Sequence, residues 1–327
     1  MLAAPDKFRG TATAAEVAGS ICRGAARAGW RAEALPLADG GEGTLEAFGG
    51  PNRITTVVGP LGYPVDAPWR LDGEAAVIEM SRASGLALVG GAAGNSAVAA
   101  TTTGTGQLIL TAVASGARRI TIAVGGSATT DGGLGALEVI AASPLRGIEL
   151  EVACDVDATF CDAATRFAAQ KGASETQVAL LRRRLESLAE DFLIEYGVDV
   201  SSLPGSGAGG GLAGGLAALG AELRGGFDLV AAAVGLASRL DTVDLVVTGE
   251  GAVDAESFRG KVVGGVLGIA RARGIPTLVV AGQVLVSAGT ECISLVDRFG
   301  AERAYGQVTD CIEAVVAEWL GASGCSF

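Results

Sequence analysis

The chain has 327 residues, enough for two α/β domains rather than one core, and 49% of them are hydrophobic while 18% are charged. Its net charge of −12 argues against nucleic acid or an anionic membrane surface as a partner. Histidine is absent, which excludes histidine-dependent triads, histidine zinc sites and imidazole proton transfer. Acid–base chemistry must therefore come from carboxylates, lysines or metal-bound water.

The six cysteines are scattered without a C-x-x-C pair, and no signal peptide is recognisable. Both features favour reduced thiols and a cytoplasmic location. The uncharged run from Ala83 to Ala117 is interrupted by Gly, Ser, Thr and Asn throughout. We therefore do not expect it to span a membrane.

The N-terminal segment is expected to alternate between strand and helix. A short strand at 2–4 leads into a loop. That loop contains Asp6, Lys7 and Arg9. Thr13 and Glu16 form a capping box that predicts a helix ending near Gly29, and residues 31–37 are expected to return as a strand.

The next segment begins with the glycine-rich loop 38–44. Short apolar runs separated by turn residues then predict β-hairpins at 54–58, 65–70 and 75–79. Residues 103–114 are expected to form a helix and 120–124 a buried strand, which opens into the loop 125–133.

The C-terminal half continues the same alternation. Ser174 and Gln177 form a second capping box, and the arginines at 182–184 are expected on the solvated face of the helix that follows. Further strands are predicted at 150–154, 244–248 and 277–281. Each ends at a loop with an acid or a glycine, and such loops bind ligands in α/β proteins.

Two glycine-rich loops are candidate anion sites. Gly125–Gly133 follows an apolar strand and precedes a predicted helix, so its N–H groups, with the hydroxyls of Ser127 and Thr129, suit a phosphate. Gly205–Gly211 also precedes an apolar helical stretch. The alternative for both loops is tight turns and close helix packing. No sound dinucleotide fingerprint or Walker-A motif is present.

Lysine is rare in this chain, with three lysines against 21 arginines. Lys7, Lys171 and Lys261 all lie beside glycines or acids. A compact ammonium in such a loop suits phosphate or carboxylate, although chance survival of each lysine is the alternative.

Carboxylates gather at the same loops: Asp39, Glu42, Asp131, Asp155, Asp157, Glu250 and Asp254. An acid between glycines at a strand end suits Mg²⁺ binding or proton transfer, and turn formation is the alternative. Lysines, glycine-rich loops and acids together favour phosphoryl transfer to a small anion.

Several motifs occur in the order of a known family: Pro5-Asp6-Lys7-Phe8, 38–44, 125–133, Gln170-Lys171-Gly172-Ala173, 205–215, and Thr248-Gly249-Glu250-Gly251 with Asp254 and Gly260-Lys261. With them the chain resembles the bacterial type II glycerate kinases. The resemblance implies that ATP and Mg²⁺ are used to phosphorylate D-glycerate to 2-phosphoglycerate. It also implies two α/β domains, one flavodoxin-like and one restriction-endonuclease-like, with mostly parallel sheets and an active-site cleft between them.

We expect residues 1–53 and 275–327 to form one domain and 54–274 an inserted larger one. Four residues are expected to be catalytic: Asp39, Glu42, Asp131 and Lys261. Eleven are expected to bind substrate or phosphate: Asp6, Lys7, Arg9, Gly125, Gly126, Ser127, Thr129, Lys171, Gly207, Gly209 and Glu250. Two are expected to bind the metal: Asp155 and Asp254.

Departures from the family pattern include Arg9, where the family usually has lysine, and the segment 158–162. They leave open a kinase for another small hydroxy acid, or a non-catalytic protein that binds a nucleotide or anion. The sequence makes no prediction of oligomeric state.

Overall fold

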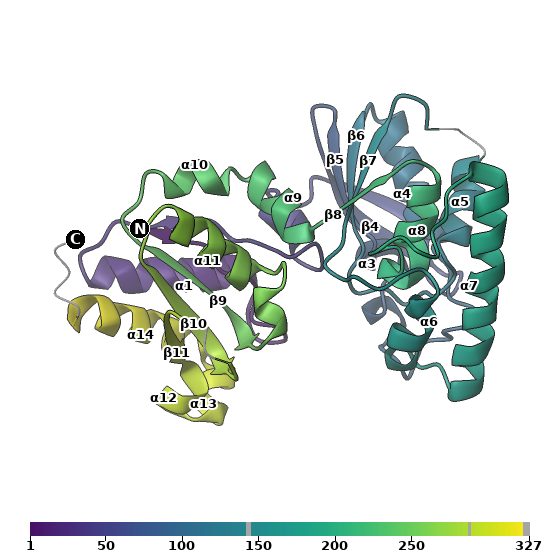
Figure 1. The fold of residues 1–327 in the computed structure, drawn as a ribbon. Helices are drawn as coiled ribbons and strands as arrows, with labels where there is room; N and C mark the ends of the chain where they lie inside the picture. Colours follow the sequence, from purple (N-terminus) through teal and green to yellow (C-terminus); the bar gives the residue numbers. More distant parts are fainter. Residues whose placement is uncertain (142–144, 287–288, 323–327) are drawn as a thin grey trace. The chain divides into compact units, whose positions relative to one another are not determined.

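The computed structural model describes residues 1–141, 145–286 and 289–322, which form two compact units (Figure 1). Unit 1 comprises Met1–Asp39, Glu46–Phe48 and Phe227–Phe327, and unit 2 comprises Gly40–Leu45 and Gly49–Gly226. In the described part of the chain, no helix is both long enough and apolar enough to cross a membrane.

Unit 1 is built on a parallel five-stranded sheet. Its spatial order is β11 (Glu291–Ser294), β10 (Thr277–Val284), β9 (Val246–Val253), β1 (Leu2–Ala3) and β2 (Glu33–Ala34). Numbered within the unit and read from β2, this is the 2-1-3-4-5 order of flavodoxin-like folds. The strand order reverses between β1 and β9, where such sheets bind their ligands.

Helices cover both faces of this sheet. On one face lie α1 (Ala14–Arg27), α14 (Val308–Ala322), α12 (Leu295–Phe299) and α13 (Ala301–Gly306). On the other lie α9 (Gly226–Ala233), α10 (Leu236–Leu240) and α11 (Val262–Ala272). Alternate strand residues face opposite layers: Ala3 and Val247 pack toward α1, whereas Leu2 and Val246 pack toward α11.

Most predicted elements of unit 1 are confirmed. The capping box of Thr13 and Glu16 begins α1, which ends at Arg27. The predicted strand at 31–37 is reduced to the two residues of β2. We expected residues 227–274 in the inserted domain, but they belong to unit 1, because β9 pairs with β1 and β10.

Unit 2 has a mixed six-stranded sheet. Its order is β3 (Arg53–Val58), β4 (Pro64–Asp72), β5 (Ala75–Glu79), β6 (Arg119–Ala123), β7 (Glu149–Ala153) and β8 (Glu222–Arg224). The first two pairings are antiparallel, as the predicted hairpins require, and the other three are parallel.

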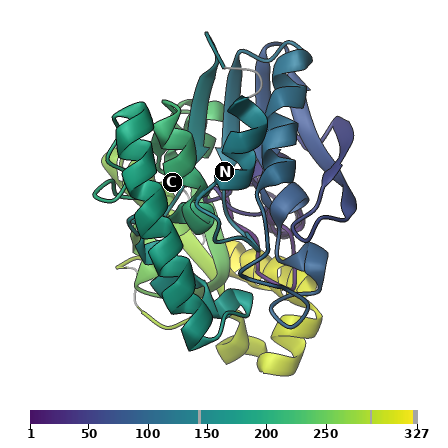
Figure 2. The same cartoon turned by 90° about the vertical axis from the view of Figure 1, so that its right-hand side faces the viewer.

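The core of unit 2 lies between this sheet and three helices: α4 (Thr103–Ala114, as predicted), α5 (Leu134–Ala141) and α8 (Leu212–Ala218). The long helix α7 (Glu175–Tyr196) begins at the predicted Ser174–Gln177 capping box and packs on α6 (Asp162–Phe167). In Figure 2, α7 runs along the side of the unit that faces the viewer. The remaining short elements are α2 (Thr44–Ala47), α3 (Ser81–Ser84), η1 (Ala87–Val89), η2 (Ala169–Lys171), η3 (Ala208–Gly211) and η4 (Glu256–Phe258).

Candidate functional site

In unit 1, a lysine lies between two aspartates at the strand-order reversal. Asp6 follows β1, and its N–H donates to Gly249 O of β9 at 2.9 Å, which ties the loop to the neighbouring strand. Lys7 Nζ lies 3.6 Å from Asp6 Oδ1 and 3.6 Å from Asp39 Oδ1. The neighbours Asp6 and Lys7 therefore meet Asp39, a predicted site residue from a later loop, where the topology favours a ligand.

Burial changes the protonation of this group. The pKa of Asp6 is raised from 3.8 to about 7. Desolvation is the largest cause, the charges of Asp39 and Glu250 also raise the pKa, and Lys7 lowers it. Burial also raises the pKa of Glu250. Glu250 Oε1 is buried and has no hydrogen-bond partner among the described residues. Such a carboxylate oxygen suits a cation or a proton from a ligand.

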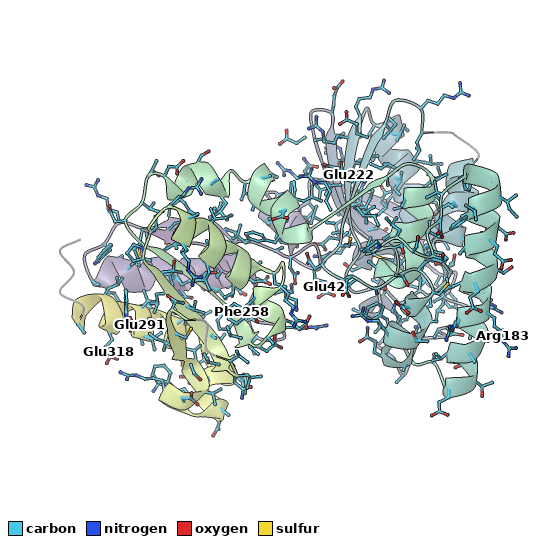
Figure 3. The ribbon with its side chains drawn as sticks, in the orientation of Figure 1. Glu42, Arg183, Glu222, Phe258, Glu291 and Glu318 are labelled. Atoms are coloured by element: carbon cyan, nitrogen blue, oxygen red, sulfur yellow. The ribbon has the colours of Figure 1, made fainter. Side chains whose placement is uncertain are left out.

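Asp254 and Lys261 border the same group. Asp254 Oδ1 accepts hydrogen bonds from the N–H groups of Glu256 at 2.8 Å and Ser257 at 3.2 Å, so it caps η4, whose Phe258 is labelled in Figure 3. Lys261 is the N-cap residue of α11, and its charge lowers the pKa of Glu250. Arg9 is exposed on the turn after Phe8, and its N atom lies near Gly251 of β9.

In unit 2, Asp131 caps helices instead of facing an open site. Its Oδ2 accepts from Thr102 N and Thr102 Oγ1, both at 2.8 Å, and the N–H groups of Gly133 and Gly135 donate to the carboxylate at 3.2 and 3.3 Å. These donors lie at the N-termini of α4 and α5, and an anion was expected at the second of these, where the Gly125–Gly133 loop ends. Burial raises the pKa of Asp131, and these hydrogen bonds oppose the rise. Its contacts favour a structural role over the catalytic one predicted.

Lys171 is fully enclosed beneath the same loop. Its side chain comes from η2 and donates to Ser127 Oγ at 2.7 Å and Thr129 O at 2.6 Å. Burial lowers its pKa from 10.5 to about 7, and the charge of Asp131 opposes this change. Ser127 and Lys171, both predicted to bind substrate or phosphate, therefore contact each other, and the ammonium holds the shape of the Gly125–Gly133 loop.

The second glycine-rich loop, 205–211, allows close packing of the chain. The N–H of Gly207 donates to Ala158 O at 3.0 Å, so it is already engaged. Gly209 has φ +63°, and an added Cβ would lie 2.9 Å from Met80 Sδ and 3.0 Å from Val124 Cβ. The alternative of tight turns and close packing therefore describes this loop better than a phosphate cradle.

Two loops of unit 2 meet at Gly125 and Gly126. A Cβ on Gly125 would lie 2.6 Å from Gly41 Cα, and one on Gly126 would lie 3.0 Å from Glu42 Oε1. Glu42, labelled in Figure 3, thus lies against the start of the Gly125–Gly133 loop. These three predicted residues are brought together by the structure.

Glu79 is a residue of this region that sequence reasoning missed. It is the last residue of β5 and is 1% exposed, and its Oε1 accepts from the N–H groups of Gly43 and Leu45. The available signal was a carboxylate at the end of the otherwise apolar run 75–79, shortly before Arg82.

The predicted metal ligands lie in different units. Asp155 Oδ1 accepts from Gly226 N at 2.8 Å in unit 2, whereas Asp254 belongs to unit 1. Within 1–141, 145–286 and 289–322, no three His, Cys, Asp or Glu residues form a group that could hold a metal ion. Mg²⁺ commonly takes only one or two protein carboxylates together with substrate phosphates. Glu250 Oε1 is buried without a hydrogen-bond partner among the described residues, and the charge of Asp254 acts on the same carboxylate. Glu250 and Asp254 therefore fit a site that supplies one or two carboxylates to Mg²⁺.

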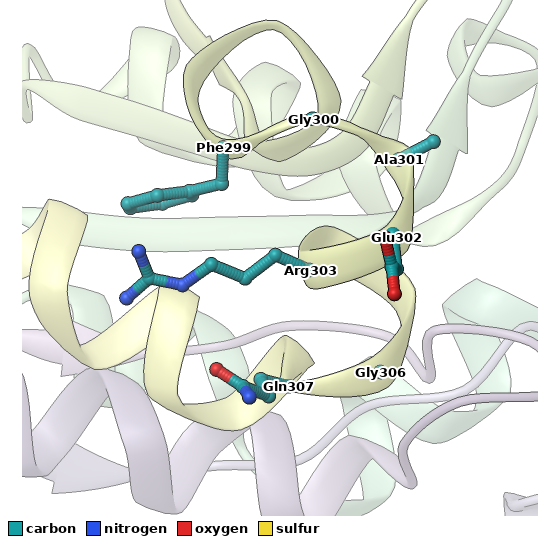
Figure 4. A pocket seen from close by; sticks show the side chains of 7 residues that line it. All are labelled: Phe299, Gly300, Ala301, Glu302, Arg303, Gly306 and Gln307. Carbon is teal, nitrogen blue, oxygen red and sulfur yellow. The ribbon is translucent and has the colours of Figure 1, made fainter.

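A surface hollow of about 520 Å³ lies elsewhere in unit 1. It is lined by Phe299, Gly300, Ala301, Glu302, Arg303, Gly306 and Gln307 (Figure 4). Arg303 lies over the Phe299 ring at 4.9 Å from its centroid. None of the predicted site residues lines this hollow. We therefore assign the chemistry to the loops at the strand ends.

Known proteins resemble this chain along almost its whole length. The sequence model of the Glycerate kinase family matches residues 1–146 and 139–304. The glycerate 2-kinase of Escherichia coli K12 is 36% identical, over 94% of this chain and 90% of that protein. A glycerate kinase of Bacillus subtilis 168 is also 36% identical, over 87% of this chain and 85% of that protein.

A solved structure agrees with these relatives. A crystal structure from Salmonella typhimurium LT2, described as a glycerate kinase 2, superposes with a TM-score of 0.85 at 32% identity. The match covers 98% of this chain and 97% of that one. The chain belongs to the glycerate kinase family.

Proposed function

We propose that this glycerate kinase transfers the γ-phosphoryl group of ATP to D-glycerate and releases 2-phosphoglycerate and ADP. The observation that carries the proposal is the Asp6–Lys7–Asp39 group at the point where the parallel sheet of unit 1 reverses its strand order. Membership of a kinase family implies a nucleotide substrate. The name of the Escherichia coli relative supports phosphorylation at the 2-position.

Asp6 is our candidate for the general base. A carboxylate with a pKa of about 7 is half ionised near neutral pH, which suits removal of a hydroxyl proton. The proton passes to Asp6 as the glycerate oxygen forms a bond to the γ-phosphorus. The bond from that phosphorus to the β–γ bridging oxygen breaks, and ADP leaves.

Positive charge must be concentrated locally in a protein with a net charge of −12, because its overall field repels glycerate and ATP. Lys7, held between Asp6 and Asp39, and Lys261 at the start of α11 supply that charge in unit 1. Mg²⁺, when bound, would neutralise charge on the ATP phosphates, and Glu250 and Asp254 are its candidate ligands.

In unit 2, we propose that Glu42 and the N–H groups around Gly125, Gly126 and Ser127 contact substrate or phosphate. The close approach of Glu42 to Gly126 supports this assignment. Lys171 and Asp131 support the loop from beneath. We also propose a cytoplasmic location, which the unpaired thiols of Cys22, Cys154, Cys161 and Cys311 support.

The test is ADP release by the purified protein with Mg-ATP and D-glycerate. L-Glycerate, lactate and glycolate serve as acceptor controls, because they test the alternative of a kinase for another hydroxy acid. The names of the relatives do not favour that alternative, or a protein that binds without catalysis. Phosphorus NMR of the product distinguishes 2- from 3-phosphoglycerate. We expect D-glycerate-dependent turnover to 2-phosphoglycerate. Turnover with another acid only, or ATP binding without turnover, would overturn the proposal.

A further inference from the structure

A buried glutamate joins the sheet of unit 2 to the loop that carries Glu42. Glu79 Oε1 accepts from Gly43 N at 2.9 Å and from Leu45 N at 2.9 Å, although these residues precede it by 36 and 34 positions. Within the loop, Thr44 Oγ1 donates to Gly41 O at 2.7 Å. The loop is therefore closed on itself and fastened to the end of β5.

The charge of Glu79 is balanced inside the protein. Arg82 Nε donates to Glu79 Oε2 at 3.0 Å, and the glutamate side chain is 1% exposed while that of Arg82 is 38% exposed. A buried carboxylate is costly unless it is paired and hydrogen-bonded, and here both oxygens have donors. A hydrophobic residue would fill this volume without that cost. The carboxylate is therefore needed for the hydrogen bonds that it accepts from Gly43 and Leu45.

Glu79 holds the backbone on both sides of Thr44, at Gly43 and Leu45, which are one and three residues after Glu42. Glu42 Oε1 in turn lies against Gly126, at the start of the proposed phosphate loop. A shift of the Gly40–Leu45 loop would therefore move Glu42 relative to Gly125 and Gly126. Displacements of about 1 Å at a reacting group can cost about 100-fold in rate.

We propose that Glu79 is a positioning residue of the kinase, which fixes Glu42 for catalysis through two backbone hydrogen bonds. The proposal rests on the proposed function, and it assigns Glu79 no contact with substrate. Arg82 supports it by holding the second carboxylate oxygen.

The test compares Glu79→Ala with Glu79→Gln. Alanine removes both acceptors, whereas glutamine keeps one oxygen that can accept from Gly43 and Leu45. We expect Glu79→Ala to lower kcat about 100-fold with KM for glycerate and ATP within about threefold, and Glu79→Gln to recover at least about tenfold of that loss. Hydrogen exchange of a peptide covering 40–48, measured without substrates, should be faster in Glu79→Ala than in the wild type, and Glu79→Gln should lie between the two.

Glu151→Ala is the matched control. Glu151 of β7 pairs with Arg224 of β8 at 2.5 Å in the same sheet, and the pair holds no loop of the site. We expect it to lower the melting temperature but to leave kcat within about twofold. Equal kcat losses in Glu79→Ala and Glu151→Ala, or no rescue by glutamine, would overturn the inference. Because the exchange measurement needs no turnover, an unchanged 40–48 peptide overturns it even if the kinase assignment itself fails.

Discussion

Lys171 makes the stability of unit 2 depend on pH. Its pKa is about 7 in the folded chain and 10.5 when exposed, because burial disfavours the ammonium. Between these values the unfolded chain binds more protons than the folded one. The contribution of Lys171 to the unfolding free energy should therefore rise with pH by up to about 1.4 kcal/mol per unit between pH 7 and 10.5, and should be flat below pH 7.

Urea denaturation of the wild type and Lys171→Met at pH 7, 8 and 9 measures this dependence. Methionine leaves Ser127 Oγ and Thr129 O without their donor, so it lowers stability at every pH, but it removes the slope. Lys261→Met is the control, because Lys261 is only partly buried and should keep the wild-type slope. Parallel curves for the wild type and Lys171→Met would contradict the prediction.

The raised pKa of Asp6 predicts how the activity depends on pH. A base acts in its ionised form, so kcat/KM should rise as pH rises through about 7, the pKa that burial gives Asp6 against the charge of Lys7. Asp6→Asn should lose at least about 100-fold in kcat and show no rise near pH 7. Asp157→Asn, which removes an exposed partner of Arg166, should leave the profile unchanged. A wild-type profile that is flat from pH 6 to 8 would exclude Asp6 as the base.

At the scale of elements, the glycine-rich loops test how tightly unit 2 is packed. Gly210 has φ +72°, and a Cβ added there would lie 1.9 Å from Thr129 O. Gly220 has φ +93° with nothing within 4 Å of an added Cβ. Alanine is strained at both positions because of the positive φ. The difference in unfolding free energy between the two variants therefore measures the clash of the added Cβ with Thr129 O. We expect Gly210→Ala to be less stable than Gly220→Ala by about 1–3 kcal/mol in urea denaturation, and equal losses would contradict this.

Local signals in the sequence predicted elements better than roles. Capping boxes and apolar periodicity placed α1, α4, α7 and the hairpins, because these depend on residues a few positions apart. The role of Asp131 could not be read in this way, since its donor Thr102 lies 29 residues earlier and only the fold brings them together. Glu79 was missed for the same reason, since the two backbone groups that it holds, at Gly43 and Leu45, lie more than 30 residues away.

The Asp6–Lys7–Asp39 group shows where sequence reasoning succeeds at longer range. Ligand loops of parallel sheets follow strand ends, and this rule placed Asp6 and Asp39 in loops before their strand order was known. The strand order then supplied what the sequence lacked, because it identifies which two strands flank the reversal. The short β2 was overestimated, since an apolar run alone does not determine how many residues find a pairing partner.

At the scale of the whole molecule, the two units differ in which parts of the sequence form their sheets. Unit 2 takes its sheet and core from one continuous stretch within 40–226. Unit 1 needs both ends of the chain, because β1 lies between β2 and β9, with Leu2 opposite both Glu33 and Val246. Removing the N-terminal segment therefore takes a central strand out of the sheet of unit 1.

This difference predicts which fragments fold. A fragment of residues 40–226 keeps all six strands of its sheet and the Glu79 contacts to Gly43 and Leu45, so it should show one cooperative thermal transition. A fragment of residues 227–327 lacks β1 and β2, which leaves Val246 and Val247 of β9 paired with β10 but no longer with β1, and should show none. Circular dichroism melts of both fragments check this. A cooperative melt of 227–327 would mean that unit 1 folds without β1 and β2, and a broad melt of 40–226 would mean that unit 2 needs the rest of the chain to fold. Either result would contradict the prediction.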